Sequence, residues 1–149
     1  MKTRKAIIFV IGLLLLTGAA AAFHLLTRDQ VSEGTVQVIY GDKTYELEIA
    51  DLDYEQVTGT RMNGKGEEIP VDASGISMKS VLELKNITDY SKVKVVSDDS
   101  YSAQLTAEEV KEDSKAYLLH EEEGELRLVV FGDTNSKRSV SNVVQIIIE

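Results

Sequence analysis

Residues 35–49 read TVQVIYGDKTYELEI, and this stretch sets the character of the domain that follows. Its first six residues favour a β-strand, and Gly-Asp at 41–42 reads as a tight turn. After the turn, Tyr45, Leu47 and Ile49 alternate with polar neighbours, which is the pattern of a strand with one buried face. The sequence therefore predicts a β-hairpin at the start of a mostly β domain.

Short strand signals of the same kind continue to the C-terminus. Further strands are predicted at residues 54–61, 93–96, 101–105, 116–119, 126–131 and 143–148. The last of these is the most apolar, which predicts a central position in its sheet. Residues 62–68 read as a loop, and residues 69–71 lead out of it.

Two short helices are predicted between the strands. Ser77 can cap the first, which is expected to turn four side chains inward: Met78, Val81, Leu82 and Leu84. A capping box from Thr106 to Glu109 begins the second. Because the strands do not alternate regularly with long helices, the sequence predicts an α+β fold that is mostly β and argues against a doubly wound parallel sheet.

The N-terminus carries an export signal. Three basic residues within the first five precede an apolar run at residues 6–26, and this order is typical of a secretory signal or a signal anchor. The run is long enough to span a membrane, whereas the small residues at 19–22 offer cleavage sites, so both fates stay open. No cysteine follows the run, which excludes lipid attachment through an N-terminal cysteine.

The order of these segments predicts three regions. Residues 1–28 are the signal anchor or signal peptide, residues 29–34 a polar tether, and residues 35–149 a single domain. Because the basic end should stay in the cytoplasm, the expected location is the cell membrane, crossed once by a helix at residues 6–26 with the C-terminal domain outside. If the signal is cleaved, the domain is secreted.

The exported part is strongly acidic and has no cysteine. Beyond residue 28 it carries 25 acidic and 12 basic residues, a formal charge of −13. This charge disfavours binding to nucleic acid and to anionic membrane surfaces, and it suits a cationic partner or simply solubility. The lack of cysteine excludes disulfides, thiolate catalysis and cysteine-ligated metals.

Four segments carry motifs that follow one another in a fixed order. Residues 45–52 read YELEIADL, residues 75–82 read GISMKSVL, and residues 93–101 read VKVVSDDSY. Residues 126–148 contain LRLVVFG, then RSVSNV and III. In this order they resemble the xDL turn, the GVxLxDLL helix start, the VxVxSxDGY turn and the LRLVVPG…K.V.NVxxIxI end of the oxidoreductase molybdopterin-binding domain family. The resemblance implies the mixed, mostly β sheet of the sulfite oxidase catalytic domain, in a small exported bacterial form.

The departures from this family concern its chemistry. Active members hold molybdenum through a cysteine thiolate, yet the corresponding region, residues 58–63, offers only Thr, Gly, Arg, Met and Asn. Ser100 stands where the family usually has Gly, and Asn135 and Ser136 stand where an aromatic is often found. The domain also lacks further segments that surround the pterin in full-length enzymes. The resemblance therefore implies the fold and argues against the family's redox chemistry.

Four basic residues form the candidate set for binding an anionic cofactor. Lys137 and Arg138 match basic positions that approach the cofactor in the family, and Arg61 and Arg127 complete the set. A guanidinium suits phosphate because it offers paired donors. The alternative is that each is an ordinary charge paired with one of the many acids, and Arg127, which alternates with leucines, is expected to face solvent.

The other polar clusters favour structural roles. Residues 98–101 (DDSY) could hold a hard cation, but the spacing of a calcium loop is absent and a turn is the simpler interpretation. His120 precedes three glutamates, and one imidazole does not make a metal site. The six tyrosines, Tyr117 among them, could line a cleft, but core packing is their default role. No P-loop, dinucleotide or nucleophile-elbow motif occurs, so neither catalytic nor metal-binding residues are predicted.

Together these features predict an exported, membrane-anchored and non-catalytic binding module for a small ligand or an envelope protein. Two alternatives stay open: a molybdopterin-binding oxidoreductase or redox protein without a cysteine ligand, and an accessory subunit of a cell-envelope complex. No cofactor is expected, and molybdopterin is the one group that the resemblance leaves open. No nucleic acid partner is expected.

Overall fold

The computed structural model describes residue 11 and residues 33–149. The chain divides into two compact units, Met1–Gln30 and Val31–Glu149, and the fold described below belongs to the second. No helix among the described residues is long and apolar enough to cross a membrane. Apart from Ile11, the predicted targeting segment at residues 6–26 lies outside the described residues, as does most of the tether at 29–34.

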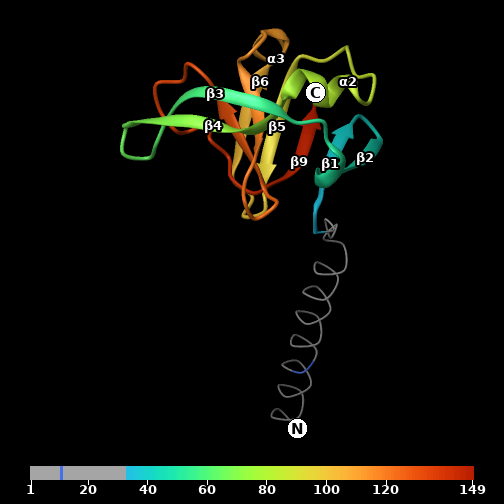
Figure 1. Ribbon diagram of the computed structural model, residues 1–149. Helices are drawn as coiled ribbons and strands as arrows, with labels where there is room; N and C mark the ends of the chain where they lie inside the picture. The colour runs from blue at the N-terminus through green and yellow to red at the C-terminus, as the bar shows by residue number, and fades with distance from the viewer. Residues whose placement is uncertain (1–10, 12–32) are drawn as a thin grey trace. The chain divides into compact units, whose positions relative to one another are not determined.

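Nine strands, two short α-helices and one 3-10 turn make up the described domain (Figure 1). In chain order they are β1 (Thr35–Tyr40), β2 (Lys43–Glu48), η1 (Ile49–Asp51), β3 (Glu55–Met62), β4 (Glu68–Ser77), α2 (Met78–Glu83), β5 (Lys92–Ser97), β6 (Ser102–Thr106), α3 (Ala107–Lys111), β7 (Ala116–His120), β8 (Leu126–Val130) and β9 (Val143–Ile148). The predicted α+β fold, mostly β with a mixed sheet, is confirmed.

Strand β9 lies at the centre of a five-stranded mixed sheet with the order β2-β1-β9-β5-β6. It runs parallel to β1, where Ile146 is opposite Val38, and antiparallel to β5, where Ile146 is opposite Val95. All three side chains are fully buried. The central position predicted for the most apolar strand is therefore confirmed.

The predicted hairpin and both predicted helix caps are confirmed. β1 and β2 form the hairpin, with Tyr40 opposite Lys43 across the Gly-Asp turn. The Ser77 hydroxyl accepts a hydrogen bond from the Ser80 amide at 3.1 Å and so caps α2. The capping box of α3 is complete, with donor–acceptor distances of 3.0 and 3.2 Å. These contacts satisfy amides that the first helical turn would otherwise leave without partners.

The first helix turns three of the four expected side chains inward. Met78, Val81 and Leu82 are buried, whereas Leu84 is 51% exposed. α2 ends at Glu83, and six helical positions place Leu84 about 240° around the axis from Met78. The expectation for Leu84 is therefore wrong, because the helix is too short and its apolar stripe too narrow to include that position.

The second sheet has four antiparallel strands in the order β3-β4-β7-β8. β4 pairs with the whole of β3 through Glu68–Gly75, but with β7 only at Gly75–Ser77. The β3–β4 hairpin therefore reaches beyond the rest of the sheet, and β3 is an edge strand (Figure 1). At residues 69–71 the sequence predicts only the exit from a loop. The structure instead has the ten-residue strand β4 there, which the polar residues and Pro70 do not indicate.

Two apolar clusters pack on opposite faces of this second sheet. Both sheets and both helices contribute to the larger cluster, which includes Leu118 and Leu128. Because neighbouring strand residues point to opposite faces, Tyr117 and Leu119 belong to a different cluster. That smaller cluster consists of Val57, Val71, Tyr117, Leu119 and Val129. It is the contact that holds the β3–β4 hairpin against β7 and β8.

A close approach at Gly75 allows this packing. A methyl group added to Gly75 would lie 2.9 Å from Leu119 Cδ2 and 3.0 Å from Val57 Cγ2. Both neighbours are buried side chains in a close-packed cluster, so neither can move aside freely. The position therefore requires glycine because of the space available and not because of its backbone angles.

The Gly75→Ala variant should lower the free energy of unfolding by about 1–3 kcal/mol, because the added methyl group overpacks the cluster. Gly64→Ala is the matched control, since nothing lies within 4 Å of its added methyl group. Its effect should stay within about 1 kcal/mol. Urea unfolding at pH 7 measures both variants, and an equal loss of stability in the two would contradict the close approach at Gly75.

Candidate functional site

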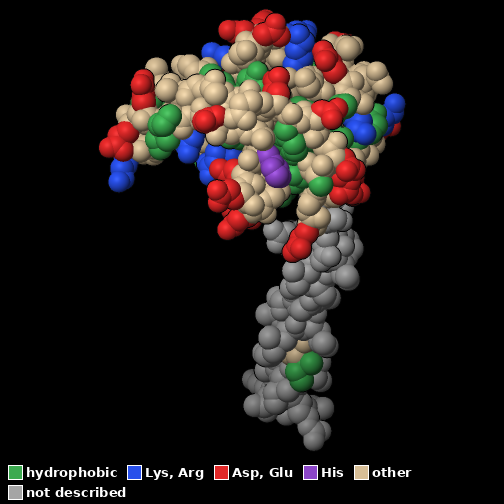
Figure 2. Space-filling model, in the orientation of Figure 1, with side chains coloured by type: hydrophobic (Ala, Val, Ile, Leu, Met, Phe, Trp, Pro, Cys, Tyr) green, Lys and Arg blue, Asp and Glu red, His purple; other side chains and the backbone are tan. Residues whose placement is uncertain are grey.

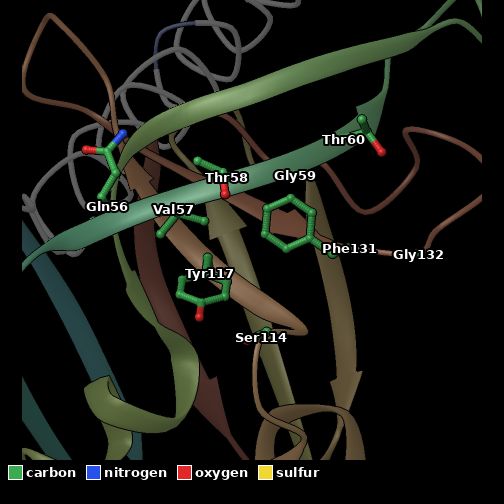
Figure 3. A pocket seen from close by; sticks show the side chains of 9 residues that line it. All are labelled: Gln56, Val57, Thr58, Gly59, Thr60, Ser114, Tyr117, Phe131 and Gly132. Carbon is green, nitrogen blue, oxygen red and sulfur yellow. The ribbon is translucent and has the colours of Figure 1, made fainter.

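A groove runs beside the edge strand β3. Its volume is about 420 Å³, and one wall is formed by β3 from Gln56 to Thr60. The rest of the lining comes from the segments at the end of β8 and the start of β7: Ser114, Tyr117, Phe131 and Gly132. Figure 3 shows Val57, Tyr117 and Phe131 gathered beside the β3 ribbon. Ligand sites span about 300–1,000 Å³, so the groove can hold a small ligand or a few side chains.

Two aromatic rings form the wall across from β3. The ring centroids of Tyr117 and Phe131 lie 5.9 Å apart in an edge-to-face arrangement, which is favourable for aromatic pairs. A methyl group added to Gly59 would lie 2.7 Å from Phe131 Cε1. The lack of a side chain at Gly59 therefore admits the Phe131 ring and keeps the groove narrow and apolar at this point.

The groove continues along β3 into a second hollow of about 260 Å³. Thr60 and Gly132 line both spaces. Arg61 and Asp133 line the second hollow. Within the described part of the chain, Arg61 makes neither an ion pair nor a side-chain hydrogen bond, so its guanidinium is available at this end of the groove.

The hydrogen-bond ladder between β3 and β4 engages alternate residues of β3. The backbone amide of Asn63 donates a hydrogen bond to the backbone carbonyl of Glu67 at 2.9 Å, so these two residues form a bonded pair. Bonded and non-bonded pairs alternate in an antiparallel ladder, which assigns the odd-numbered residues of β3 to the bonds with β4. Pro70 has no amide hydrogen, and it stands opposite the even-numbered Thr60, as this alternation requires.

The even-numbered residues of β3 consequently turn their backbone groups away from β4. Within the groove wall these residues are Gln56, Thr58 and Thr60, and their side chains are exposed. β3 stands at the end of its sheet, and β4 is the one described strand that pairs with it. Three amides and three carbonyls along the groove wall thus remain open to an added strand.

Arg138 is held by two carboxylates of its own domain. Its Nε and Nη2 donate to Asp133 at 2.9 and 2.6 Å, and its Nη1 donates to both carboxylate oxygens of Glu109 at 2.8 Å. The hydrogen bonds with Asp133 raise the pKa of Arg138 above its usual value; partial burial opposes this and Glu109 adds to it. Partial burial raises the pKa of Glu109, but the Thr106 amide and Arg138 outweigh burial and hold that pKa below its usual value.

Arg127 is likewise paired. Its Nε donates to Glu121 at 2.6 Å, and its Nη1 lies 3.5 Å from the Ser139 hydroxyl. The side chain is half-buried, between the buried Leu126 and Leu128, and lies outside the groove lining. Arg127 points to the face of β8 opposite Leu126 and Leu128, which agrees with the predicted alternation. Its guanidinium is paired with Glu121 and is not fully open to solvent.

Lys137 lies on the exposed loop between β8 and β9. Its backbone carbonyl accepts a hydrogen bond from the Tyr101 hydroxyl, and its ammonium makes no ion pair with any described residue. Of the four predicted cations, Arg61 alone lines the groove or its continuation, and Arg138 reaches that region through Asp133. Binding of an anionic cofactor by this set stays a prediction.

The acidic segment at residues 98–101 forms a hydrogen-bonded hairpin turn. The Asp98 carboxylate accepts a hydrogen bond from the Asn142 amide group at 2.6 Å, and the Asp99 carboxylate accepts one from the Tyr101 backbone at 3.0 Å. Ser100 has a φ of 71°, a left-handed conformation that glycine adopts more easily. The turn interpretation is confirmed: the Asp99 carboxylate accepts a hydrogen bond within the turn, and the Asp98 carboxylate accepts one from Asn142, next to β9.

A larger hollow of about 950 Å³ has an acidic lining. Five carboxylate residues contribute to it: Glu33, Glu48, Asp98, Glu123 and Glu125. His120 also lines it and packs on Tyr54 with ring centroids 4.9 Å apart, and burial raises the pKa of Tyr54 to about 12. No three His, Cys, Asp or Glu side chains in the described part of the chain gather as a metal-binding group. Figure 2 shows that acidic side chains are spread widely over the domain, so this lining reflects the general charge of the surface.

Sequence reasoning missed the residues that build the groove. Core packing is predicted for Tyr117 and is confirmed, since Tyr117 is buried in the smaller cluster, but its place in the groove wall is not predicted. Gly59 and Phe131 have no predicted role at a site. The one local signal is a Phe-Gly pair at the end of a predicted strand. That signal does not indicate which distant strand lies beside the phenylalanine ring.

The geometry of the groove is the main guide to function. No protein-family model matches the chain, and no curated protein matches it either. The resemblance to molybdopterin-binding domains therefore stays a prediction.

Replacing Arg138 with glutamine should lower the free energy of unfolding by about 2 kcal/mol at pH 7. The change leaves two partly buried carboxylates, Asp133 and Glu109, without their shared cation. Lys137→Gln is the matched control on the same loop, and its effect should stay within about 0.5 kcal/mol. Urea unfolding of both variants makes the comparison, and equal stabilities would show that the ion pairs contribute nothing.

The effect of Arg138→Gln should also depend on pH. Because the folded pKa of Glu109 lies below its usual value of 4.5, its contribution is fully present above that value and is lost as the pH falls through the folded pKa. The stability difference between the wild-type chain and the variant should shrink below about pH 4. A difference that stays constant from pH 7 to the acid limit of folding would contradict the assigned role of Glu109.

Proposed function

We propose that this chain is a non-catalytic, membrane-anchored binding module whose domain works outside the cytoplasm and takes up an extended polypeptide along β3. The observation that carries the proposal is the open edge of β3, which forms the wall of a groove with aromatic rings opposite. Backbone groups of an added strand would supply affinity, and side chains entering the groove would supply specificity.

The chemistry of the groove lining supports binding rather than catalysis. Among the described residues that line it, the side chains are amide, hydroxyl, aliphatic and aromatic groups, without a carboxylate or an imidazole. A general base or a nucleophile activated by one would need such a group within hydrogen-bond reach. The sequence also has no cysteine, so a thiolate nucleophile is ruled out.

The N-terminal sequence supports the proposed location. In this proposal residues 6–26 stay uncleaved and anchor the chain in the cell membrane, and the acidic domain lies on the outer side. Cleavage would instead release the same module as a secreted protein. If the bound polypeptide belongs to a membrane complex, the module acts as an accessory subunit of that cell-envelope complex.

We also propose that the domain has the sulfite oxidase type of molybdopterin fold, without the metal ligand. The mostly β architecture with a mixed sheet is compatible with this assignment. The region expected to carry the thiolate, residues 58–63, runs along the groove and its continuation. The proposed peptide groove would then occupy the place of a lost cofactor site.

One observation favours a second candidate, an oxidoreductase that retains molybdopterin without a cysteine ligand. Arg61 presents an unpaired guanidinium in the hollow that adjoins this region. Elemental analysis and pterin fluorescence of the chain, produced in a molybdenum-supplied host, separate the two candidates. We expect neither molybdenum nor pterin, whereas stoichiometric amounts of both, lost in Arg61→Ala, would replace the binding module with the redox protein.

Thr58→Pro should weaken binding of an extended peptide about tenfold, because it removes an amide donor from the open edge. The Thr58 amide points away from β4, so the β3–β4 ladder should survive the change. The measurement uses peptides selected from a random display library against the full chain in detergent, with affinity determined by fluorescence anisotropy.

Thr58→Val is the matched control, because it alters the exposed side chain but keeps the amide. It should bind the selected peptides as the wild type does. Hydrogen exchange should show protection of the Gln56, Thr58 and Thr60 amides in the complex. Failure of a monomeric chain to select any peptide, or equal affinities for the proline and valine variants, would refute uptake along β3.

A further inference from the structure

We infer that the strand added to β3 is β3 of a second copy of this chain, in an antiparallel pair centred on Thr58. This inference rests on the proposed function in that it uses the same groove and the same open edge. It goes further by naming the partner, the register and the symmetry of the pair.

The open backbone groups are compatible with this register. Centring an antiparallel pair on Thr58 places Thr58 opposite Thr58 and Gln56 opposite Thr60 of the second copy. These are the residues whose amides and carbonyls point away from β4 within the groove wall. Every open backbone group along the wall of one copy therefore meets an open group of the other.

Charge complementarity selects this register. With Thr58 at the centre, Glu55 of each copy lies opposite Arg61 of the other. Glu55 is exposed, Arg61 is half-buried, and within the described part of the chain neither side chain has an ion-pair partner. Opposite charges facing each other across an antiparallel pair stabilise it. Centring the pair on Gly59 instead would place Arg61 opposite Val57, and both ion pairs would be lost.

An apolar contact is available in the same register. Val57 of one copy lies opposite Gly59 of the other, which has no side chain of its own and whose Cβ position would lie 2.7 Å from the Phe131 ring. Val57 already turns toward the aromatic side of β3, and the groove there has a volume of about 420 Å³. The valine of the second copy would thus pack against the edge of the Phe131 ring along the groove.

Other sheet edges of the domain are less open to such pairing. β2 carries three charged side chains along its six residues: Lys43, Glu46 and Glu48. The edge of β8 is partly covered, because the Leu128 amide donates to the Val140 carbonyl at 2.8 Å. β6 has only five residues. β3 has eight residues and no charge between Glu55 and Arg61, so it is the edge with least protection against an added strand.

Cysteine cross-linking of the full chain in detergent tests the register directly. The chain has no cysteine of its own, so Thr58→Cys introduces a single thiol. The paired Thr58 Cα atoms should lie about 5.5 Å apart, which a disulfide can span. Mild oxidation should convert most of the protein to a covalent dimer on a non-reducing gel.

Thr60→Cys is the matched control on the same edge of the same strand. In the proposed register the two Thr60 residues are four positions out of alignment, about 13 Å apart, and should not cross-link. Equal cross-linking of the two variants, or none in Thr58→Cys, would overturn the pair.

A charge exchange tests the same pair without a new covalent bond. Arg61→Glu should raise the dimer dissociation constant at least tenfold in analytical ultracentrifugation, because like charges then face each other twice. Adding Glu55→Arg to that variant exchanges the charges and should restore the constant to within about threefold of wild type. A double variant as weak as the single one would refute the proposed register.

The outcomes separate this inference from the function on which it rests. A monomeric wild-type chain that still binds library peptides, with Thr58→Pro weaker than Thr58→Val, would refute the second copy and leave the peptide groove standing. A dimer that cross-links through Thr58 supports both. A monomer that binds no peptide would refute both.

Discussion

The domain depends on one strand pairing that joins its two ends. β9, the last described strand, lies between β1 and β5, so the mixed sheet cannot form until the last strand of the domain meets its first. A hydrogen bond of 3.0 Å between the side chains of Gln145 and Gln37 spans 108 positions of sequence within this pairing. The hairpins β1–β2 and β5–β6 can each form locally, but β9 makes them one sheet and buries Ile146 between their strands.

The parts of the fold that the sequence predicts are those that local physics determines. The alternation of apolar and polar residues predicts the β1–β2 hairpin, and the capping residues Ser77 and Thr106 predict where the two helices begin. The apolar run at the C-terminus predicts that β9 is a central strand. β4 was not predicted because a strand tolerates Pro70 only where the missing amide faces away from the partner strand. The local sequence does not show which way that position faces. The groove could not be predicted for a related reason. Phe131 and Gly59 are far apart in the sequence, and the course of the β3–β4 hairpin brings them together.

The predicted basic residues of the candidate site fall into two groups, those paired with a carboxylate and those without an ion pair. In a domain with twice as many acids as bases, a cation near the surface usually finds a carboxylate, and Arg127 and Arg138 both do so. Since Arg138 already holds Asp133 and Glu109, an anionic ligand there would have to displace bonds of 2.6–2.9 Å. Arg61 is different: Glu68 and Asp133 line the same hollow, but Arg61 forms an ion pair with neither of them, and Asp133 is already bound to Arg138.

An open sheet edge is a hazard unless its pairing is restricted. The middle of β3, from Gln56 to Thr60, has no charge, and the chain has no disulfide to stiffen it. The charges at its two ends supply the restriction in the proposed pair. Parallel stacking in register, the arrangement of growing fibres, would place Arg61 beside Arg61 and Glu55 beside Glu55. The antiparallel pair instead matches opposite charges and uses the same edge on both copies, so it closes at two chains. The residues that favour the dimer are thus the ones that oppose open-ended assembly.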